Sequence, residues 1–410
     1  MKKQLLICLL CATLALLLTV GVVVAAQEVQ PKPASLENAS SASASSIAWV
    51  QVNQDGFGNI DNYGITSLSS FNGYLYAGTG NDSGTGAQLW RSADGQSWTV
   101  VSNNGLGDTD NGDILDSIEF NGMFYVGVGN EVAGGRVYRS SNGTAWTQVA
   151  FPGFDPTNVG IFQFAVFNGY IYAGTYTGEA GEAPPFGVEI WRSSTGNSGD
   201  WTQVVSNGFD NDVGTNRIVA LYVYNGYLYA GTDDWSGTEV WRSNNGTDWD
   251  QVNLDGFGDT FNWSVSLEFF KGYLYAGTYN YFTSDNPGCE LWRCILCNGS
   301  DWERVTSVKG FGDIENRAIW SLEIFDGFLY AMTYNNTTGI EVWRTQDGTN
   351  WVQVNRDGFE DSSNKSPYFD NSVTTYKDNL YIGTKNGTSG GEIWLYLPNT
   401  VYLPSVVRSP

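Results

Sequence analysis

The chain has 410 residues, of which 43 are Asp or Glu and 20 are Lys or Arg, so its formal net charge is −23. Such an acidic chain offers no basic face for neutralising phosphates, which argues against nucleic acid as a partner. It contains no histidine, which excludes a Ser-His-Asp or Cys-His catalytic arrangement, a histidine general base and any histidine-containing zinc site.

The N-terminal region has the pattern of an export signal. Lys2 and Lys3 precede an apolar run that ends in small residues near Ala26, and this pattern predicts a signal peptide over residues 1–26. The run is also long enough to serve as an uncleaved membrane anchor. Residues 27–46 are rich in Ser, Ala and Pro and predict a flexible linker. We therefore expect a secreted or cell-surface protein that contacts a membrane only if the anchor is retained.

The rest of the chain is a repeat. Tryptophan recurs about every 50 residues, at Trp49, Trp98, Trp146, Trp201, Trp249, Trp302 and Trp351. Between these positions, four short segments of β-branched and aromatic residues return, with turn residues such as Asn72-Gly73 between the first two. Four strands per repeat of this length predict a β-propeller built from four-stranded antiparallel blades.

The two ends of the repeat region complement each other. The segment at Trp49 matches the fourth strand of a repeat, whereas the last repeat supplies only three strands, between residues 372 and 396. We therefore expect the N-terminal strand to complete the last blade, so that the ring closes without an open sheet edge. The predicted fold is all-β: a seven-bladed β-propeller over residues 47–397, followed by a C-terminal tail over residues 398–410.

The turn between the third and fourth segments has a recognisable form. It reads Ser92-Ala93-Asp94-Gly95 and is followed by Trp98. This resembles the Asp-box of sialidase-like propellers, a Ser/Thr-x-Asp-x-Gly turn followed by Trp, although it is one residue shorter. The resemblance covers residues 49–396 and implies a propeller fold in which these turns are structural. That family's three arginines, tyrosine with glutamate, and aspartate acid do not map onto this sequence, so no catalytic residue is carried over.

Three cysteines follow the predicted signal peptide, Cys289, Cys294 and Cys297, all in one repeat. Export permits a disulfide, and both Cys289–Cys297 and Cys294–Cys297 are compatible with the sequence. A single CxxC without a second one argues against a zinc site.

Two further features recur and are therefore interpreted as architecture. A loop of the form Asp-Gly-Phe-Gly recurs before the first strand segment of a repeat, and its first copy is at residues 55–58. We expect Phe57 of this copy to pack between neighbouring blades. The third strand segment of most repeats contains a tryptophan, with a glutamate two residues before it and, in several repeats, an arginine directly after it. One example is Glu341 and Arg344, on either side of Trp343. We interpret such residues as ion pairs within or between blades.

One loop of this set is unusually acidic. It contains Asp108, Asp110 and Asp113 within six residues. Hard cations bind several oxygens at short spacing, so these three are the candidate ligands for Ca²⁺, which is the one cofactor that the sequence suggests.

Residues that break the repeat mark the candidate binding site. Three tryptophans fall outside the repeat positions, and other aromatic and basic residues lie near them. The candidates are Trp235, Trp263, Trp320, Tyr279, Tyr281, Tyr334, Arg217 and Arg317. Aromatic rings with a few polar groups in the concave mouth of a propeller suit a sugar or another small organic ligand. The alternative is that Trp320 packs between blades and the other rings are exposed incidentally.

Two glutamates form a candidate catalytic pair. Glu268 and Glu323 occupy the same inner-strand position in adjacent repeats, and paired carboxylates act as acid and base in glycosidases when their spacing suits. We expect them to share one pocket with the three repeat-breaking tryptophans.

The function expected from the sequence is that of a monomeric, non-catalytic module that binds an extracellular carbohydrate or protein partner. One alternative is a glycosidase or lyase that works with carboxylates. The other is a structural surface protein that is stabilised by calcium.

Overall fold

The computed structural model describes residues 48–150, 154–155, 157–178, 187–211, 214–281 and 287–398. These residues belong to one compact unit, Ser45–Pro410. They form an all-β fold with short 3-10 helices and, within the described ranges, no α-helix. None of the described residues forms a helix with the length and apolar character that crossing a membrane requires. The predicted signal peptide, the linker and the tail after Pro398 lie outside the described residues.

The strands follow one another in groups of four, counted over the described residues. Group one is β2 (Gly64–Phe71), β3 (Tyr74–Gly80), β4 (Leu89–Ser92) and β5 (Trp98–Ser102). Group two is β6 (Asp113–Phe120), β7 (Met123–Gly129), β8 (Arg136–Ser140) and β9 (Thr147–Ala150). Group three is β10 (Gly160–Phe167), β11 (Tyr170–Tyr176), β12 (Ile190–Ser193) and β13 (Thr202–Val205). Group four is β14 (Thr215–Tyr224), β15 (Tyr227–Asp234), β16 (Val240–Ser243) and β17 (Asp250–Gln251).

The remaining groups continue the pattern. Group five is β18 (Asn262–Phe270), β19 (Tyr273–Asn280), β20 (Leu291–Cys294) and β21 (Glu303–Arg304). Group six is β22 (Asn316–Phe325), β23 (Phe328–Asn335), β24 (Val342–Thr345) and β25 (Val352–Gln353). Group seven is β26 (Val373–Tyr376), β27 (Asn379–Gly383), β28 (Ile393–Leu397) and, from the start of the chain, β1 (Ala48–Gln51). The 3-10 helices are η1 (Asp55–Gly58), η2 (Gly105–Gly107), η3 (Phe209–Asn211), η4 (Asp255–Gly258), η5 (Lys309–Gly312), η6 (Asp357–Glu360) and η7 (Asp370–Ser372).

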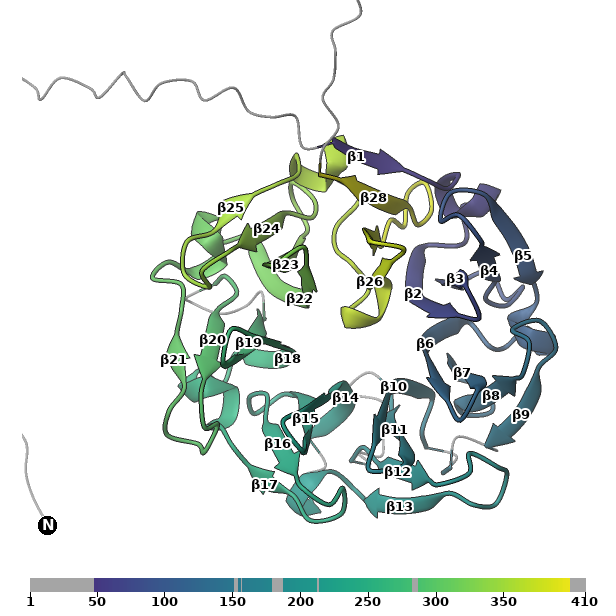
Figure 1. Cartoon of the computed structure of the whole chain (residues 1–410), viewed down its shortest axis with the longest axis horizontal. Coiled ribbons are helices and arrows are strands. Elements are labelled where there is room, and N and C mark those ends of the chain that lie inside the picture. The colour runs from purple at the N-terminus through teal and green to yellow at the C-terminus, as the bar shows by residue number, and fades with distance from the viewer. Residues whose placement is uncertain are drawn as a thin grey trace, which may run out of the picture. The chain divides into compact units, whose positions relative to one another are not determined.

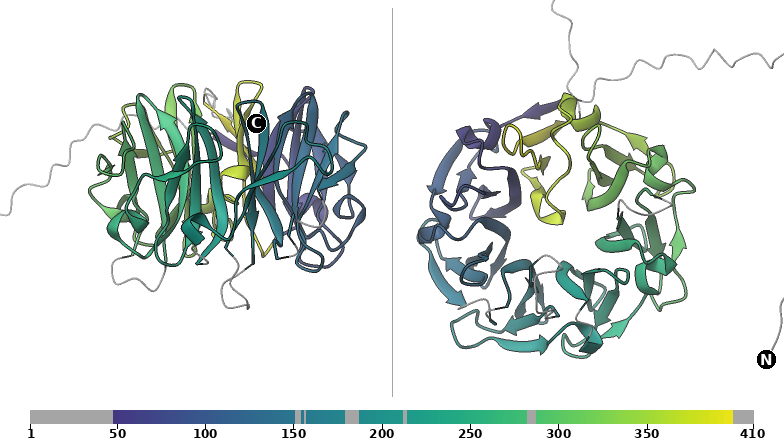
Figure 2. Two further views of the ribbon diagram at one scale, coloured as in Figure 1. Left: turned by 90° about the horizontal axis from the view of Figure 1, so that it is seen from below. Right: turned by 180° about the vertical axis from the view of Figure 1, so that it is seen from behind.

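Each group is an antiparallel meander in which consecutive strands pair, as β2 with β3, β3 with β4 and β4 with β5. Within the compact unit the groups are arranged around one axis, with the first strand of each group nearest the axis and the fourth at the outside (Figure 1). Seen from the side, the strands run along this axis (Figure 2). Loops that join the same strands of successive groups therefore gather at the same end of the unit.

The first strand lies in the same sheet as the last three. Trp49 of β1 pairs with Tyr396 of β28, and the sheet order is β1-β28-β27-β26. The Trp49 indole Nε1 also donates to the carbonyl of Val354 at 2.8 Å. Group seven in turn contacts group one, because the backbone N–H of Ile65 donates to the carbonyl of Thr384 at 3.0 Å.

The repeated Asp-Gly-Phe-Gly loop packs as expected. The Phe57 ring stacks on Trp90 with 4.4 Å between centroids and meets Trp98 edge-on at 5.6 Å. The apolar cluster around these three side chains contains residues of both group seven and group one. Phe57 has a positive φ of 56°, which is uncommon for a residue with a side chain. The aromatic contacts hold the ring in this conformation.

The expected Glu–Arg ion pair is wrong for Glu341 and Arg344. The Glu341 carboxylate accepts hydrogen bonds from Trp343 Nε1 at 2.8 Å and Asn316 Nδ2 at 2.7 Å. Arg344 donates instead to the Tyr396 hydroxyl at 2.7 Å and lies over the Phe328 ring. The reason is the strand geometry, since side chains three residues apart point to opposite faces of a sheet.

The Asp-box-like turn is held by its own aspartate. Asp94 Oδ1 accepts hydrogen bonds from the backbone N–H groups of Gln96 at 2.9 Å and Ser97 at 2.6 Å, and Ser92 Oγ donates to it at 2.8 Å. These bonds, led by the one from Ser97, hold the pKa of Asp94 well below its usual range. The turn is thus a compact connection between β4 and β5.

Candidate functional site

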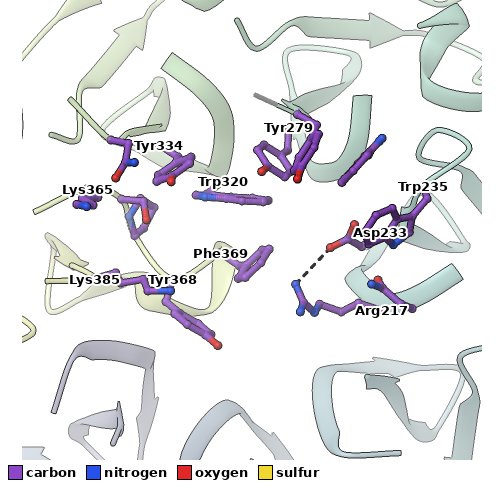
Figure 3. A pocket seen from close by; sticks show the side chains of 16 residues that line it. Arg217, Asp233, Trp235, Tyr279, Trp320, Tyr334, Lys365, Tyr368, Phe369 and Lys385 are labelled. Atoms are coloured by element: carbon purple, nitrogen blue, oxygen red, sulfur yellow. Dashed lines mark hydrogen bonds and ion pairs between the residues drawn. The ribbon is translucent and has the colours of Figure 1, made fainter. Parts of the chain in front are cut away.

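A cavity of about 520 Å³ opens at one end of groups four to seven (Figure 3). We call it the aromatic cavity. It is lined by Asn216, Arg217, Asp233, Trp235, Trp263, Tyr279, Tyr281, Trp320, Tyr334, Asn336, Lys365, Ser366, Pro367, Tyr368, Phe369 and Lys385. Many of these residues lie where a first strand begins or a second strand ends, and antiparallel pairing brings those two positions together. Arg217 of β14, for example, is the register partner of Asp233 of β15.

The wall formed by groups four and five is a continuous row of rings. Trp235 is the first residue after β15, and it is 44% exposed. Its ring centroid lies 4.5 Å from that of Trp263, and Trp263 stacks on Tyr281 at 3.8 Å with 14° between the planes. This packing orders the exposed Trp235 ring at the mouth of the cavity.

Trp320 joins this wall to the other side of the cavity. Its ring lies 4.8 Å from Tyr279 of group five, 6.4 Å from Tyr334 of group six and 4.3 Å from Phe369, which precedes β26. Trp320 therefore packs between groups and also lines the cavity. The sequence-based expectation that Trp235, Trp263 and Trp320 share one pocket agrees with these positions.

The basic residues of the cavity differ in their surroundings. Arg217 Nη1 forms an ion pair with Asp233 Oδ2 at 3.2 Å, and its guanidinium lies 4.2 Å from the centre of the Tyr176 ring. Lys385 is exposed, with Nζ 5.4 Å from the Tyr63 ring centre and 5.7 Å from that of Tyr368. Arg217 is thus a buried residue of the lining, whereas Lys385 is an exposed one.

Arg317, which the sequence placed in the site, does not line the cavity. Its Nη2 is 3.5 Å from Glu315 Oε1, and its Nε and Nη1 are buried without a hydrogen-bond partner among the described residues. Desolvation raises the pKa of Tyr334, and the positive charge of Arg317 opposes that shift. The charge of Arg317 therefore acts on a tyrosine of the lining, although Arg317 itself is not part of the lining.

The sequence missed the contribution of group seven. Lys365, Tyr368, Phe369 and Lys385 all line the cavity, although the repeat gave no reason to join them to tryptophans of groups four to six. The available signal was the stretch before β26, where the last repeat departs from the others.

The predicted calcium site is wrong as a cluster of aspartates. Asp108 forms an ion pair with Arg136, whose hydrogen bond is the first cause of the lowered pKa of Asp108. Asp113 accepts a hydrogen bond from the Tyr63 hydroxyl at 2.6 Å, and Asp110 is exposed. In the described part of the chain, no three acidic or cysteine side chains are placed to hold a metal ion. The loop turns each carboxylate toward a different partner.

Glu268 and Glu323 lie in a second, smaller cavity of about 210 Å³, which we call the carboxyl cavity. Asp370 and Tyr222 also line it, and the Tyr222 hydroxyl donates to Glu268 Oε1 at 2.5 Å. The expectation that both glutamates share the pocket of the tryptophans is therefore wrong. Glu268 is five residues beyond Trp263 on β18, which places it about 16 Å farther along the strand.

Burial in the carboxyl cavity raises the pKa values of the three acids that line it. Desolvation raises the pKa of Glu268 to about 7 and that of Asp370 to about 8. It also raises the pKa of Glu323 well above its usual range, with further contributions from the charges of Glu268 and Asp370. These three groups hold protons at pH values where exposed carboxyls are ionised.

The cysteines decide between the two expected pairings. Cys294 and Cys297 form a disulfide, and Cys289 is buried and free. The bond closes the turn after β20, and Arg242 donates to the carbonyl of Leu296 within that turn at 2.8 Å.

No protein-family model matches the chain, and no curated protein matches it. Among solved structures, a GH74 xyloglucanase from Xanthomonas campestris is similar with a TM-score of 0.55 at 16% identity, over 85% of this chain and 53% of the xyloglucanase chain. A prolyl endopeptidase is similar with a TM-score of 0.52 at 14% identity, over 83% and 51% of the two chains. The chain thus spans about half the length of these two proteins. At such identities the similarity shows the fold alone, which is a β-propeller.

Proposed function

We propose that this chain is an exported or cell-surface propeller of seven blades, closed by β1, that binds carbohydrate without catalysis. The pairing of β1 with β28 and the hydrogen bond from Ile65 to Thr384 support closure. Each group then serves as one four-stranded blade, and β1 gives the last blade the same short outer strand that the other blades have. The pattern of residues 1–26 supports export.

The observation that carries the binding proposal is the ordered row of rings in the aromatic cavity. Trp235 presents a large exposed ring that is held by Trp263, and Trp263 is held by Tyr281. A rigid aromatic face can pack against the apolar face of a sugar ring without losing side-chain freedom on binding. Asn216 and Asn336 in the lining offer amide groups for sugar hydroxyls.

The size of the cavity favours a small ligand over a protein partner. Its volume of about 520 Å³ falls in the range of small-molecule sites. A folded protein needs a much larger surface for stable association, about 800 Å² on each partner. A few sugar rings fill the cavity, whereas a protein would reach it only with a protruding side chain or loop.

The test is a glycan array followed by calorimetry on the best ligand. We expect Trp235→Ala to weaken binding by about tenfold or more, since hot-spot tryptophans contribute at least that much. Leu254→Ala is the matched control, because Leu254 is exposed and lies outside the cavity lining. If no glycan binds, or if Trp235→Ala binds as well as the unchanged protein, the proposal is wrong.

A second candidate, acid–base glycoside hydrolysis, rests on the carboxyl cavity. Glu268 has the raised pKa of a general acid, and Glu323 lies in the same cavity. Turnover of aryl glycosides that is lost in Glu268→Gln would support this function. The separation of the cavity from the tryptophan row makes it the weaker candidate, because the sugar-stacking rings and the acids do not face the same space.

A further inference from the structure

The aromatic cavity has a charge opposite to that of the chain as a whole. In the full sequence, acidic residues outnumber basic ones by 43 to 20. Among the residues that line the cavity, the basic side chains are Arg217, Lys365 and Lys385, and the one acidic side chain is Asp233. A concentration of positive charge at one concave site of a strongly acidic protein is a local feature that solubility does not explain.

The acidic side chain of the lining forms an ion pair with the arginine of the lining. Asp233 is paired with Arg217 at 3.2 Å, and both side chains are largely buried. Beside this pair, the lining contains two further basic side chains, Lys365 and Lys385.

Asp113 is an acid on which the charge of Lys385 acts, and it has an aromatic hydrogen-bond partner. Asp113 is hydrogen-bonded to the Tyr63 hydroxyl, and it is Tyr63 whose ring faces the Lys385 ammonium group. Asp113 is absent from the cavity lining. The ammonium group of Lys385 can therefore contact a ligand in the cavity, and the carboxylate of Asp113 cannot.

The charges and the rings occupy different sides of the cavity. Figure 3 shows Lys365 and Lys385 together on the side of group seven, with Trp235 on the opposite side and Trp320 between them. A ligand that spans the cavity therefore meets aromatic faces at one end and ammonium groups at the other. This arrangement orients the ligand as well as binding it.

We propose that the ligand is an acidic saccharide, whose sugar ring stacks at the Trp235 side while its carboxylate or sulfate group binds Lys385 and Lys365. The inference rests on the proposed carbohydrate binding and adds the chemical class of the sugar. An ammonium group binds either anion, so the shared chemistry is a pyranose that carries a negative substituent.

The experiment compares matched sugars by calorimetry at low salt. One arm uses oligogalacturonate and its fully methyl-esterified, neutral form. The other uses a sulfated galactan oligosaccharide and its desulfated form. We expect at least one acidic form to bind about tenfold or more tightly than its neutral partner, and its affinity to fall as salt rises.

Three lysine variants show whether the charge acts in the cavity. We expect Lys385→Met to lose about tenfold in affinity for the acidic sugar and Lys385→Arg to keep most of it. Lys271→Met is the matched control, because Lys271 is also exposed but lies away from the cavity. It directly follows the last residue of β18, whereas Trp263 lies near the first residue of that strand. The control should bind as the unchanged protein does.

The outcomes separate this inference from the proposal beneath it. If neutral and acidic sugars bind equally and Trp235→Ala weakens both, the binding proposal stands and the acidic class is wrong. An equal loss in Lys385→Met and Lys271→Met would also overturn the inference, because it would indicate attraction to the whole surface. If none of these sugars binds, the acidic class is wrong, and the glycan array decides separately whether the binding proposal stands.

Discussion

At the scale of single residues, the same side-chain type has different roles in this protein because its surroundings differ. Asp94 is exposed, and hydrogen bonds from its own turn lower its pKa. Asp370 lies in the carboxyl cavity, where desolvation raises its pKa to about 8. The first stabilises a turn in its ionised form, whereas the second is most compatible with the fold when it is protonated.

This difference predicts how stability depends on pH. The unfolded chain releases carboxyl protons near pH 4, whereas Glu268 and Asp370 keep theirs to about pH 7 and 8. The folded state therefore binds more protons in this interval, and its free energy of unfolding falls as pH rises from about 4 to 8. Below pH 4 these carboxyls are protonated in both the folded and the unfolded state. Their contribution to the free energy of unfolding is then fully present.

Glu268→Gln isolates the effect, because the amide keeps the shape and carries no charge. We expect the difference in Tm between this variant and the unchanged protein to grow in favour of the variant between pH 4.5 and 8. Glu119→Gln, at an exposed position of β6, is the control and should show no such trend. A difference that stays constant with pH would mean that Glu268 is not protonated in the folded state.

At the scale of elements, the turn between the third and fourth strands is where one blade contacts the previous one. Gly246, in the turn after β16, has a positive φ of 74°, and a Cβ there would lie 1.8 Å from the Tyr172 hydroxyl oxygen of group three. Gly226, in the hairpin between β14 and β15, has a similar φ of 78°, but a Cβ there would meet nothing within 4 Å. The two glycines share a backbone conformation and differ in their neighbours.

These two positions make a matched pair of substitutions. Both Gly226→Ala and Gly246→Ala strain the backbone by a similar amount, since alanine disfavours positive φ. Only Gly246→Ala also collides with Tyr172, so we expect it to lower the free energy of unfolding by about 1–3 kcal/mol more than Gly226→Ala does. Denaturant unfolding measures both, and equal losses would show that the contact between the blades is not tight.

At the scale of the whole propeller, contacts distant in sequence join groups on different sides of the axis. Asn371 of η7 donates from Nδ2 to the carbonyls of Leu115 in group two, at 2.8 Å, and Phe162 in group three, at 2.9 Å. Gln163 donates to the Asn371 side-chain oxygen at 2.7 Å. The segment before β26 thus reaches across the axis, and it is the same segment that brings Tyr368 and Phe369 to the aromatic cavity.

Closure by β1 can be tested by shortening the chain. A protein that begins at Ser45 keeps β1, whereas one that begins at Asn53 lacks it and leaves β28 as an unpaired edge. We expect the shorter protein to have a clearly lower Tm and to self-associate, because exposed strand edges pair with other chains. Calorimetry and light scattering check this, and identical behaviour of the two proteins would argue against closure.

The strands and the tryptophans of the site were accessible from sequence for a physical reason. Alternating side chains and turn residues act over a few positions, so every repeat specifies its own strands. Because the repeat defines what is structural, Trp235, Trp263 and Trp320 could be recognised as departures from it. Glu268 and Glu323 were also recognised as candidates. Their position farther along the inner strands, in the carboxyl cavity and away from the tryptophans, was not recognised.

What the amino-acid pattern alone decides is local: the all-β repeat, its turns and the residues that break it. The tertiary structure decides which of those residues meet. Lys385 and Tyr368 join the tryptophans of distant repeats because the groups are arranged around one axis. The aspartates of the loop at 108–113 are close in sequence, yet they face Arg136, Tyr63 and solvent. Spacing along the chain determines which residues are close in sequence. The direction of each side chain depends on partners from other groups, which only the tertiary structure brings near it.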